Sequence, residues 1–246
     1  MVALNKNREI KIIADPNDLF NAVAEDFTQR AIDSVNNHGV FNVVLAGGNT
    51  PKLFFDALAA NDFCRTKTPW QQIKFYFGDE RYVPTTDVAS NYHMAYEHLF
   101  SKVSVLVENI FPIPTKFKEP KDAAKQYESI IKNVKFDLIY LGLGDDAHTA
   151  SLMPFSEVVT SSTNQLVAAL WVPQLKMYRI TLTSTAINNA ACVIFLVEGA
   201  NKAPAVYSVL AGPTEPQKYP AQLIQPSQGK TIWYLDQAAA GKLKIV

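Results

Sequence analysis

The chain has 246 residues, of which 48% are hydrophobic and 19% charged, so it is long enough to bury a sizeable core. Lysine and arginine together number 23, as do aspartate and glutamate, and this balance argues against a nucleic-acid-binding protein, which usually carries a basic excess. No apolar run is long enough to cross a bilayer and the first residues lack the apolar segment of a signal peptide, so we expect a cytoplasmic protein with no membrane partner. The two cysteines lie far apart in the sequence and are expected to be reduced thiols.

Short apolar runs alternate along the chain with helical stretches, and no repeat or linker interrupts them. The predicted strands cover residues 9–13, 41–45, 73–77, 136–141, 166–172, 179–182, 193–197 and 231–235. The predicted helices cover residues 16–37, a stretch from Ser90 through Leu99, and residues 120–133 and 202–210. Several strands are apolar without alternation, which is typical of parallel strands covered on both faces. We therefore predict a single α/β domain over residues 1–246: a doubly wound, mostly parallel, Rossmann-like sheet with helices on both faces, whose ligands bind at the carboxyl ends of the strands.

The first polar loop follows the predicted strand at 41–45 and reads Gly47-Gly48-Asn49-Thr50-Pro51. The two glycines let the backbone approach a ligand closely. Thr50 is expected to cap the next helix, with Pro51 in its first turn. Free N–H groups at a helix start suit a phosphate. The loop is neither a P-loop nor a GxGxxG turn, so an ordinary strand-to-helix turn remains the alternative.

The second loop, Asp79-Glu80-Arg81, also comes directly after a predicted strand, FYF. Three charged residues beside a glycine form either a solvated turn or a polar site. The local pattern alone favours the solvated turn.

The third loop follows the apolar run FDLIYL and contains His148 two residues after Asp146. A histidine with a nearby carboxylate at the end of a core strand has the ingredients of a general base and its orienting partner. His148 has no second histidine or cysteine at ligand spacing, so a general base is favoured over a metal ligand. The histidines at 38, 93 and 98 are interpreted as structural or solvated.

The fourth signal consists of two cations, Arg179 and Lys202, each on or just past an apolar strand. An arginine offers a planar fork and a lysine a point charge, so together they can hold an anion from two sides. Either residue alone is better explained as surface charge.

Five ordered segments between residues 45 and 240 resemble the 6-phosphogluconolactonase family, which belongs to a wider group with glucosamine-6-phosphate deaminases and ribose-5-phosphate isomerases. The segments are LAGGNTPKLFFDAL, FYFGDERYVPTTDVASNYHMA, FDLIYLGLGDDAHTASLMP, RITLTSTAINNAACVIFLVEGANKAPAV and PAQLIQPSQGKTIWYLDQAAA. Each is a weak motif, but the ordered set is specific.

The resemblance implies hydrolysis of 6-phospho-D-glucono-1,5-lactone to 6-phosphogluconate, the second step of the oxidative pentose phosphate pathway, without a cofactor or metal. The family signature GxGxDGH maps the catalytic histidine to His148 and its acidic partner to Asp146. The GDER stretch maps a substrate contact to Arg81, which we count with His148 and Asp146 as catalytic because either Arg81 or loop N–H groups can stabilise the oxyanion. We include Asp79 among the substrate-binding residues. The phosphate pocket maps to Gly47, Gly48, Asn49, Thr50, Arg179 and Lys202.

Two residues depart from the family pattern. Asn49 stands where the family usually has serine, which replaces a hydroxyl donor with an amide. Ala147 stands where it usually has glycine, and a left-handed backbone there would cost alanine about 1–2 kcal/mol.

Three other functions are the alternatives. A sugar-phosphate deaminase or isomerase on the same scaffold would carry an acid after the histidine loop, where this chain has Met153 before Pro154. A non-catalytic sugar-phosphate-binding protein would have no need of Asp146 and His148. A dinucleotide oxidoreductase would show a glycine fingerprint after its first strand, and none is present. The sequence does not reveal the oligomeric state, for which a monomer or weak dimer is expected.

Overall fold

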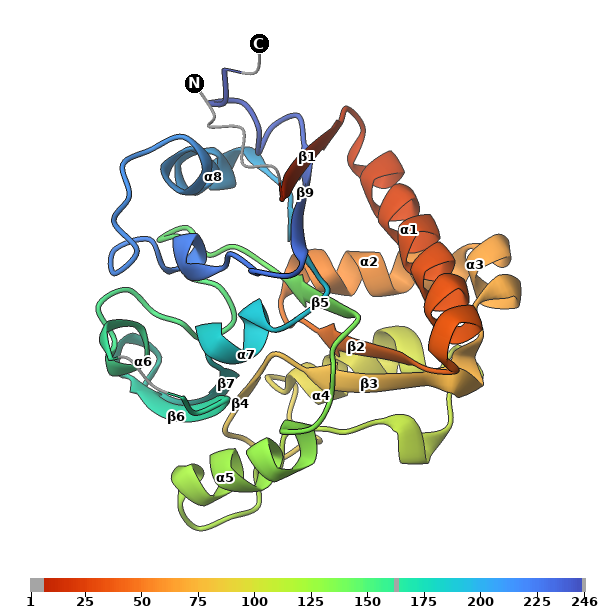
Figure 1. Cartoon of the computed structure of the whole chain (residues 1–246), viewed down its shortest axis with the longest axis horizontal. Helices are drawn as coiled ribbons and strands as arrows, with labels where there is room; N and C mark the ends of the chain where they lie inside the picture. The colour runs from red at the N-terminus through yellow and green to blue at the C-terminus, as the bar shows by residue number, and fades with distance from the viewer. Residues whose placement is uncertain (1–6, 162–163, 245–246) are drawn as a thin grey trace.

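A computed structural model describes residues 7–161 and 164–244 (Figure 1). The main sheet has six parallel strands in the order β1-β9-β8-β5-β2-β3. These strands are β1 (Arg8–Ile13), β2 (Phe41–Leu45), β3 (Ile73–Phe77), β5 (Leu138–Leu141), β8 (Cys192–Val197) and β9 (Lys230–Asp236). Every residue of β5 and β8 is buried, so both faces of these central strands are covered, as their unbroken apolar sequences predict.

A second sheet has three antiparallel strands in the order β4-β7-β6: β4 (Asp79–Arg81), β6 (Val167–Val172) and β7 (Met177–Leu182). The runs at 166–172 and 179–182 are strands, as predicted, but they lie in this second sheet and not in the main parallel one. Only Pro173–Lys176 separate β6 from β7, with Lys176 in a left-handed turn at φ 50°. So short a connection permits only antiparallel pairing, since a parallel crossover needs a dozen or more residues. In Figure 1 this small sheet lies beside α6 (Glu157–Thr160) and α7 (Ser184–Asn188), away from α1.

The longest helix, α1 (Pro16–His38), begins and ends where its sequence predicts. Asp15 accepts a hydrogen bond from the Asn17 N–H at the start, and Gly39 ends the helix at φ 82°, which is left-handed and suits glycine. The remaining described helices are α2 (Asn49–Ala60), α3 (Asp62–Lys67), α4 (Asn91–Ala95) with a π-helical turn over Tyr96–Phe100, α5 (Pro120–Ile131) and α8 (Ala203–Leu210).

The parallel order brings the polar loops to one edge of the main sheet. The segments that follow β8, β5, β2 and β3 leave neighbouring strands at their carboxyl ends. Because neighbouring strands lie about 4.8 Å apart, residues from separate loops come within side-chain reach of one another. This edge is where a parallel sheet is expected to bind its ligand.

Candidate active site

His148 and Asp146 form a close pair in the loop after β5. The Nδ1 atom of His148 lies 2.5 Å from Oδ1 of Asp146, and the same oxygen accepts a hydrogen bond from the His148 backbone N–H at 3.1 Å. The hydrogen bond with His148 lowers the pKa of the Asp146 carboxyl below its usual range, although partial burial opposes this shift. An ionised carboxylate at Nδ1 favours a proton on that nitrogen, which leaves Nε2 as the basic atom. The His148 side chain is 32% exposed, so solvent reaches it.

The backbone around this pair depends on two small residues. A Cβ on Gly144 would lie 2.1 Å from Nδ1 of His148 and 2.7 Å from Oδ1 of Asp146, so only glycine fits beside the pair. Ala147 has φ 63° and is 1% exposed, so this alanine does adopt the left-handed conformation that glycine prefers. Its carbonyl accepts a hydrogen bond from the Ala221 N–H at 3.0 Å, which helps to hold the turn in place.

The glycine turn after β2 differs from its expected geometry. The first residue of α2 is Asn49 and its N-cap is Gly48, with φ 105° and no side-chain hydrogen bond, so the prediction that Thr50 caps this helix is wrong. The glycine at φ 105° lets the chain enter the helix two residues earlier than a threonine cap would. Asn49 and Thr50 instead occupy the first turn, where backbone N–H groups lack intrahelical partners and can bind an anion.

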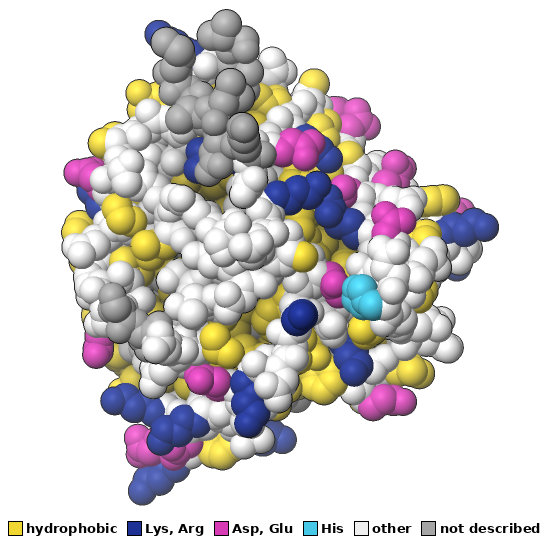
Figure 2. Space-filling view, viewed as in Figure 1, with side chains coloured by type: hydrophobic (Ala, Val, Ile, Leu, Met, Phe, Trp, Pro, Cys, Tyr) yellow, Lys and Arg dark blue, Asp and Glu magenta, His cyan; other side chains and the backbone are white. Residues whose placement is uncertain are grey.

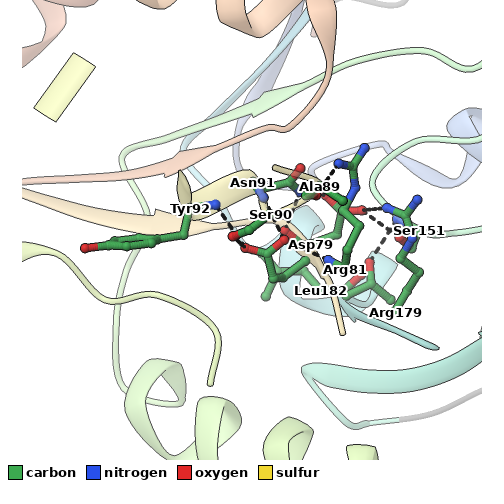
Figure 3. Close-up of polar contacts among 11 residues, drawn as sticks. Asp79, Arg81, Ala89, Ser90, Asn91, Tyr92, Ser151, Arg179 and Leu182 are labelled. Carbon is green, nitrogen blue, oxygen red and sulfur yellow. Dashed lines mark hydrogen bonds and ion pairs between the residues drawn. The ribbon is translucent and has the colours of Figure 1, made fainter. Parts of the chain in front are cut away.

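Asp79 is buried rather than solvated, because β4 pairs with β7. Its carboxylate accepts hydrogen bonds from Ser151 Oγ at 2.6 Å and Asn91 Nδ2 at 3.0 Å, and it lies 3.5 Å from Nη1 of Arg179 (Figure 3). The solvated turn that the local pattern favoured is therefore wrong. Sequence reasoning missed Asn91 and Ser151, although both lie in segments that carry the family resemblance.

Glu80 is the most heavily bonded carboxylate of this region and is 1% exposed. Its two oxygens accept hydrogen bonds from the backbone N–H groups of Arg81, Asn91 and Tyr92 and from Ser90 Oγ, at 2.7–3.0 Å. Burial outweighs these bonds and raises the pKa of Glu80. The bonds fix β4 against the start of α4, where Ser90 is the N-cap that the sequence predicts. Sequence reasoning assigned no role to Glu80.

Arg81 and Arg179 lie side by side, since they are partners in the β4–β7 register. The Nη1 of Arg81 donates a hydrogen bond to the Ala89 carbonyl at 2.6 Å, which holds the guanidinium against the loop before α4 (Figure 3). The Nε atoms of both arginines are buried and have no hydrogen-bond partner in the described part of the chain. Desolvation lowers the pKa of Arg179, and the positive charge of Arg81 adds to this effect. Each of these guanidinium groups therefore has a buried donor without a partner among the described residues and can offer it to a negatively charged oxygen of a substrate.

Lys202 lies in the short helical turn Ala200–Lys202 after β8 and pairs with Asp145 of the loop after β5. Its Nζ is 2.6 Å from Oδ1 of Asp145, and Asn201 Nδ2 donates to the same oxygen at 3.1 Å. The two predicted phosphate-binding cations therefore have different partners in this structure, Asp79 for Arg179 and Asp145 for Lys202.

Other predicted properties bear on the site less directly. Residues 7–161 and 164–244 contain no group of three or more His, Cys, Asp or Glu side chains able to hold a metal ion, and the expectation of a metal-free enzyme stays a prediction. Within the same residues, none of the helices is long and apolar enough to traverse a membrane. On the face shown in Figure 2, basic and acidic side chains are interspersed. The absence of a nucleic-acid partner, the cytoplasmic location and the oligomeric state also stay predictions.

Comparisons with known proteins establish the family of the chain. The family model described as glucosamine-6-phosphate isomerases/6-phosphogluconolactonase matches residues 14–233, which is most of the chain. The chain belongs to this family. A 6-phosphogluconolactonase of Synechocystis sp. is 38% identical over 226 residues, which cover 88% of this chain and 90% of that protein.

Solved structures give the same relationship at the level of the fold. The crystal structure of the devB protein is 31% identical with a TM-score of 0.87, and the match covers 96% of this chain and 100% of that one. The 6-phosphogluconolactonase from Thermotoga maritima is 30% identical with a TM-score of 0.80, over 93% and 99% of the two chains. These matches extend over nearly the whole of each chain, so the fold is shared along the length of this protein.

Proposed function

We propose that this protein hydrolyses 6-phospho-D-glucono-1,5-lactone to 6-phospho-D-gluconate, the second step of the oxidative pentose phosphate pathway. The observation that carries the proposal is the His148–Asp146 pair at the end of β5, in a chain that belongs to a family with lactonases. A δ-lactone has an activated carbonyl, so the reaction mainly requires a positioned general base, a hydrogen-bond donor to the oxyanion and a phosphate-binding site.

The reaction begins with attack of water on C1 of the lactone. Nε2 of His148 takes a proton from the water as the new C1–O bond forms, and the carbonyl electron pair moves onto oxygen. Asp146 holds Nδ1–H and stabilises the imidazolium that results. When the intermediate collapses, the bond from C1 to the ring oxygen breaks and His148 returns the proton to that oxygen. The products are the open-chain acid and its C5 hydroxyl, and no other reactant is needed.

Arg81 and the phosphate-binding residues hold the substrate around this centre. In this proposal Arg81 binds the lactone oxygen, where its positive charge stabilises the oxyanion. The N–H groups of the Gly47–Thr50 turn, with Arg179 and Lys202, take the phosphate, whose binding orients the ring for attack. The buried contacts of Asp79 with Ser151 and Arg179 suit a positioning role better than direct substrate binding.

The catalytic proposal is tested by His148→Ala, assayed on lactone generated in situ against the spontaneous rate of hydrolysis. His38→Ala is the matched control, because His38 also contacts an aspartate, Asp137, at 3.1 Å but lies at the end of α1. We expect kcat to fall at least about 100-fold for His148→Ala and to change little for the control. A folded His148→Ala variant with near-normal kcat would remove the general base from the proposal.

The phosphate assignment is tested by comparing the phosphorylated lactone with glucono-1,5-lactone. Arg179→Ala and Lys202→Ala should each lose about 1.5–3 kcal/mol in kcat/KM on the phosphorylated substrate, the worth of a charge-assisted hydrogen bond. They should add little to the already poor activity on glucono-1,5-lactone. If both substrates suffer equally, the two cations act at the carbonyl and the assignment is inverted.

The deaminase or isomerase on the same scaffold remains the alternative function. Met153 and Pro154 stand where the deaminase resemblance requires an acid, so the structure offers no residue at that position for its proton transfer. Release of ammonia from glucosamine 6-phosphate, in place of lactone hydrolysis, would favour this alternative.

A further inference from the structure

Two consecutive aspartates in the loop after β5 have separate partners. Asp146 holds His148, whereas Asp145 holds Lys202, with 2.6 Å between its Oδ1 and the lysine Nζ. Asn201 Nδ2 donates to the same carboxylate oxygen at 3.1 Å. Asp145 and Lys202 leave neighbouring strands, β5 and β8, at the edge where the substrate is proposed to bind.

In the proposed function the ammonium group of Lys202 binds the substrate phosphate. In this structure the same ammonium group donates a hydrogen bond to the carboxylate of Asp145. A lysine ammonium is a compact point charge, and an anion gains most from it at hydrogen-bond distance. A phosphate dianion that approaches Lys202 therefore meets the negative charge of Asp145. The two anions repel each other, and only one of them can use the donor that now points at Asp145.

We propose that Asp145 is a built-in competitor for the phosphate: Lys202 exchanges Asp145 for the phosphate when the sugar phosphate binds, and takes Asp145 back as the product leaves. This inference rests on the proposed function in one respect, that Lys202 binds the phosphate. It makes Asp145 a residue that sets affinity and release, with no part in bond making.

The local structure allows this exchange without disturbing the catalytic pair. The Asp145 side chain is 68% exposed and the Lys202 side chain 22%, so the carboxylate can turn into water while the lysine stays. The turn around His148 is closed by bonds that do not use the Asp145 side chain: the Gly144 N–H donates to the His148 carbonyl at 2.8 Å and the Ala147 N–H to the Gly144 carbonyl at 3.0 Å. Departure of Asp145 should therefore change substrate affinity and leave the geometry of Asp146 and His148 intact.

A purely orienting role for Asp145 predicts the opposite sign. If Asp145 aims Lys202 at the phosphate, its loss weakens phosphate binding. If Asp145 competes, its loss strengthens phosphate binding. The sign of a single substitution thus separates the two roles.

The test is Asp145→Asn, which keeps the size of the side chain and removes its charge. Exposed ion pairs are worth up to about five-fold in an equilibrium constant, and removal of the like charge acts in the same direction. We expect KM for the phosphorylated lactone and the inhibition constant of 6-phosphogluconate to fall together by about three- to five-fold. The KM for glucono-1,5-lactone should change by less than about two-fold, because that substrate carries no phosphate. Asp62→Asn on α3 is the control: Asp62 is paired with Arg65 at the same distance of 2.6 Å, and its substitution makes the same change in net charge.

A double-mutant cycle with Lys202→Met assigns the effect to the pair. In the Lys202→Met background, Asp145→Asn should no longer tighten the binding of 6-phosphogluconate, measured by titration calorimetry. Unchanged or weaker binding in Asp145→Asn alone overturns the exchange, as does a Lys202→Met protein that binds 6-phosphogluconate as tightly as wild type.

Calorimetry also separates this inference from the proposed activity. If the wild type fails to hydrolyse the lactone but Asp145→Asn tightens the binding of 6-phosphogluconate, the proposed activity fails and the exchange stands. If the wild type is an active lactonase and Asp145→Asn leaves both constants unchanged, the activity stands and the exchange fails.

Discussion

Gly144 offers a direct test of whether the close pair of His148 and Asp146 is needed for catalysis. A Cβ at this position would lie 2.1 Å from Nδ1 and 2.3 Å from Cε1 of His148, and 2.7 Å from Oδ1 of Asp146. Side chains do not tolerate such contacts closer than 3.0 Å, so in Gly144→Ala the imidazole must move by about 1 Å. Both side chains are partly exposed and can move toward solvent, so the fold should survive.

The expected loss follows from this displacement. A misplacement of about 1 Å in a catalytic group can cost about 100-fold in rate, or roughly 2.7 kcal/mol. The phosphate-binding residues lie in other loops, so KM should change much less than kcat. The φ of Gly144 is not left-handed, so alanine adds no backbone strain. The lower entropy of alanine in the unfolded chain, worth up to about 1 kcal/mol, offsets part of the cost of moving the two side chains.

The assay is lactone hydrolysis, with thermal unfolding measured on the same preparations. Gly142→Ala is the matched control, because no heavy atom lies within 4 Å of the Cβ that it would gain. We expect kcat to fall about 100-fold for Gly144→Ala and less than about three-fold for Gly142→Ala. Near-normal kcat in Gly144→Ala would refute the need for the close pair. An equal loss in both variants would show that the whole loop, rather than the pair, is sensitive.

Four further predictions concern backbone strain, buried charge, pH and metal. Ala147→Gly should change the free energy of unfolding by less than about 1 kcal/mol, because relief of about 1–2 kcal/mol of left-handed backbone strain offsets the lost methyl burial and the added entropy of the unfolded chain. The control, Ala31→Gly inside α1, relieves no strain and should lower the free energy of unfolding by about 2 kcal/mol and Tm by about 4–8 °C. Glu80→Gln loses one carboxylate oxygen that accepts two hydrogen bonds, so Tm should fall at neutral pH. Because burial raises the pKa of Glu80 above 4.5, the native state holds this proton more tightly, and the stability of wild type relative to Glu80→Gln should decline as pH rises from 4.5 to the raised pKa. The pKa of Asp146 is lowered, so wild type should be more stable than Asp146→Asn above pH 3.8. This difference in stability should disappear as pH falls through the lowered pKa, and acid unfolding of both proteins measures it. Prolonged chelation should leave lactonase activity intact, and a loss that one divalent ion restores would contradict the metal-free mechanism.

Local patterns predicted the elements and several of the residues that meet at the site. The last four residues of the run that ends at Leu141 form β5 and are all buried, because a strand covered on both faces is apolar throughout. The signals for α1 act within a few residues of its ends, so Pro16 and Gly39 delimit it in both sequence and structure. The pairing of His148 with Asp146 was also predictable, since only one residue separates them.

The partners of the charged residues were decided by tertiary structure. Asp79 and Glu80 look like a solvated turn, yet both are buried because β4 pairs with β7 about 100 residues further along the chain. Ser151 reaches Asp79 across 72 residues and Lys202 reaches Asp145 across 57. A residue pattern predicts the local conformation and which face of a helix or strand is buried, because both depend on neighbours in the sequence. The choice among distant partners depends on which strand ends the sheet order brings together, and no local pattern contains that information.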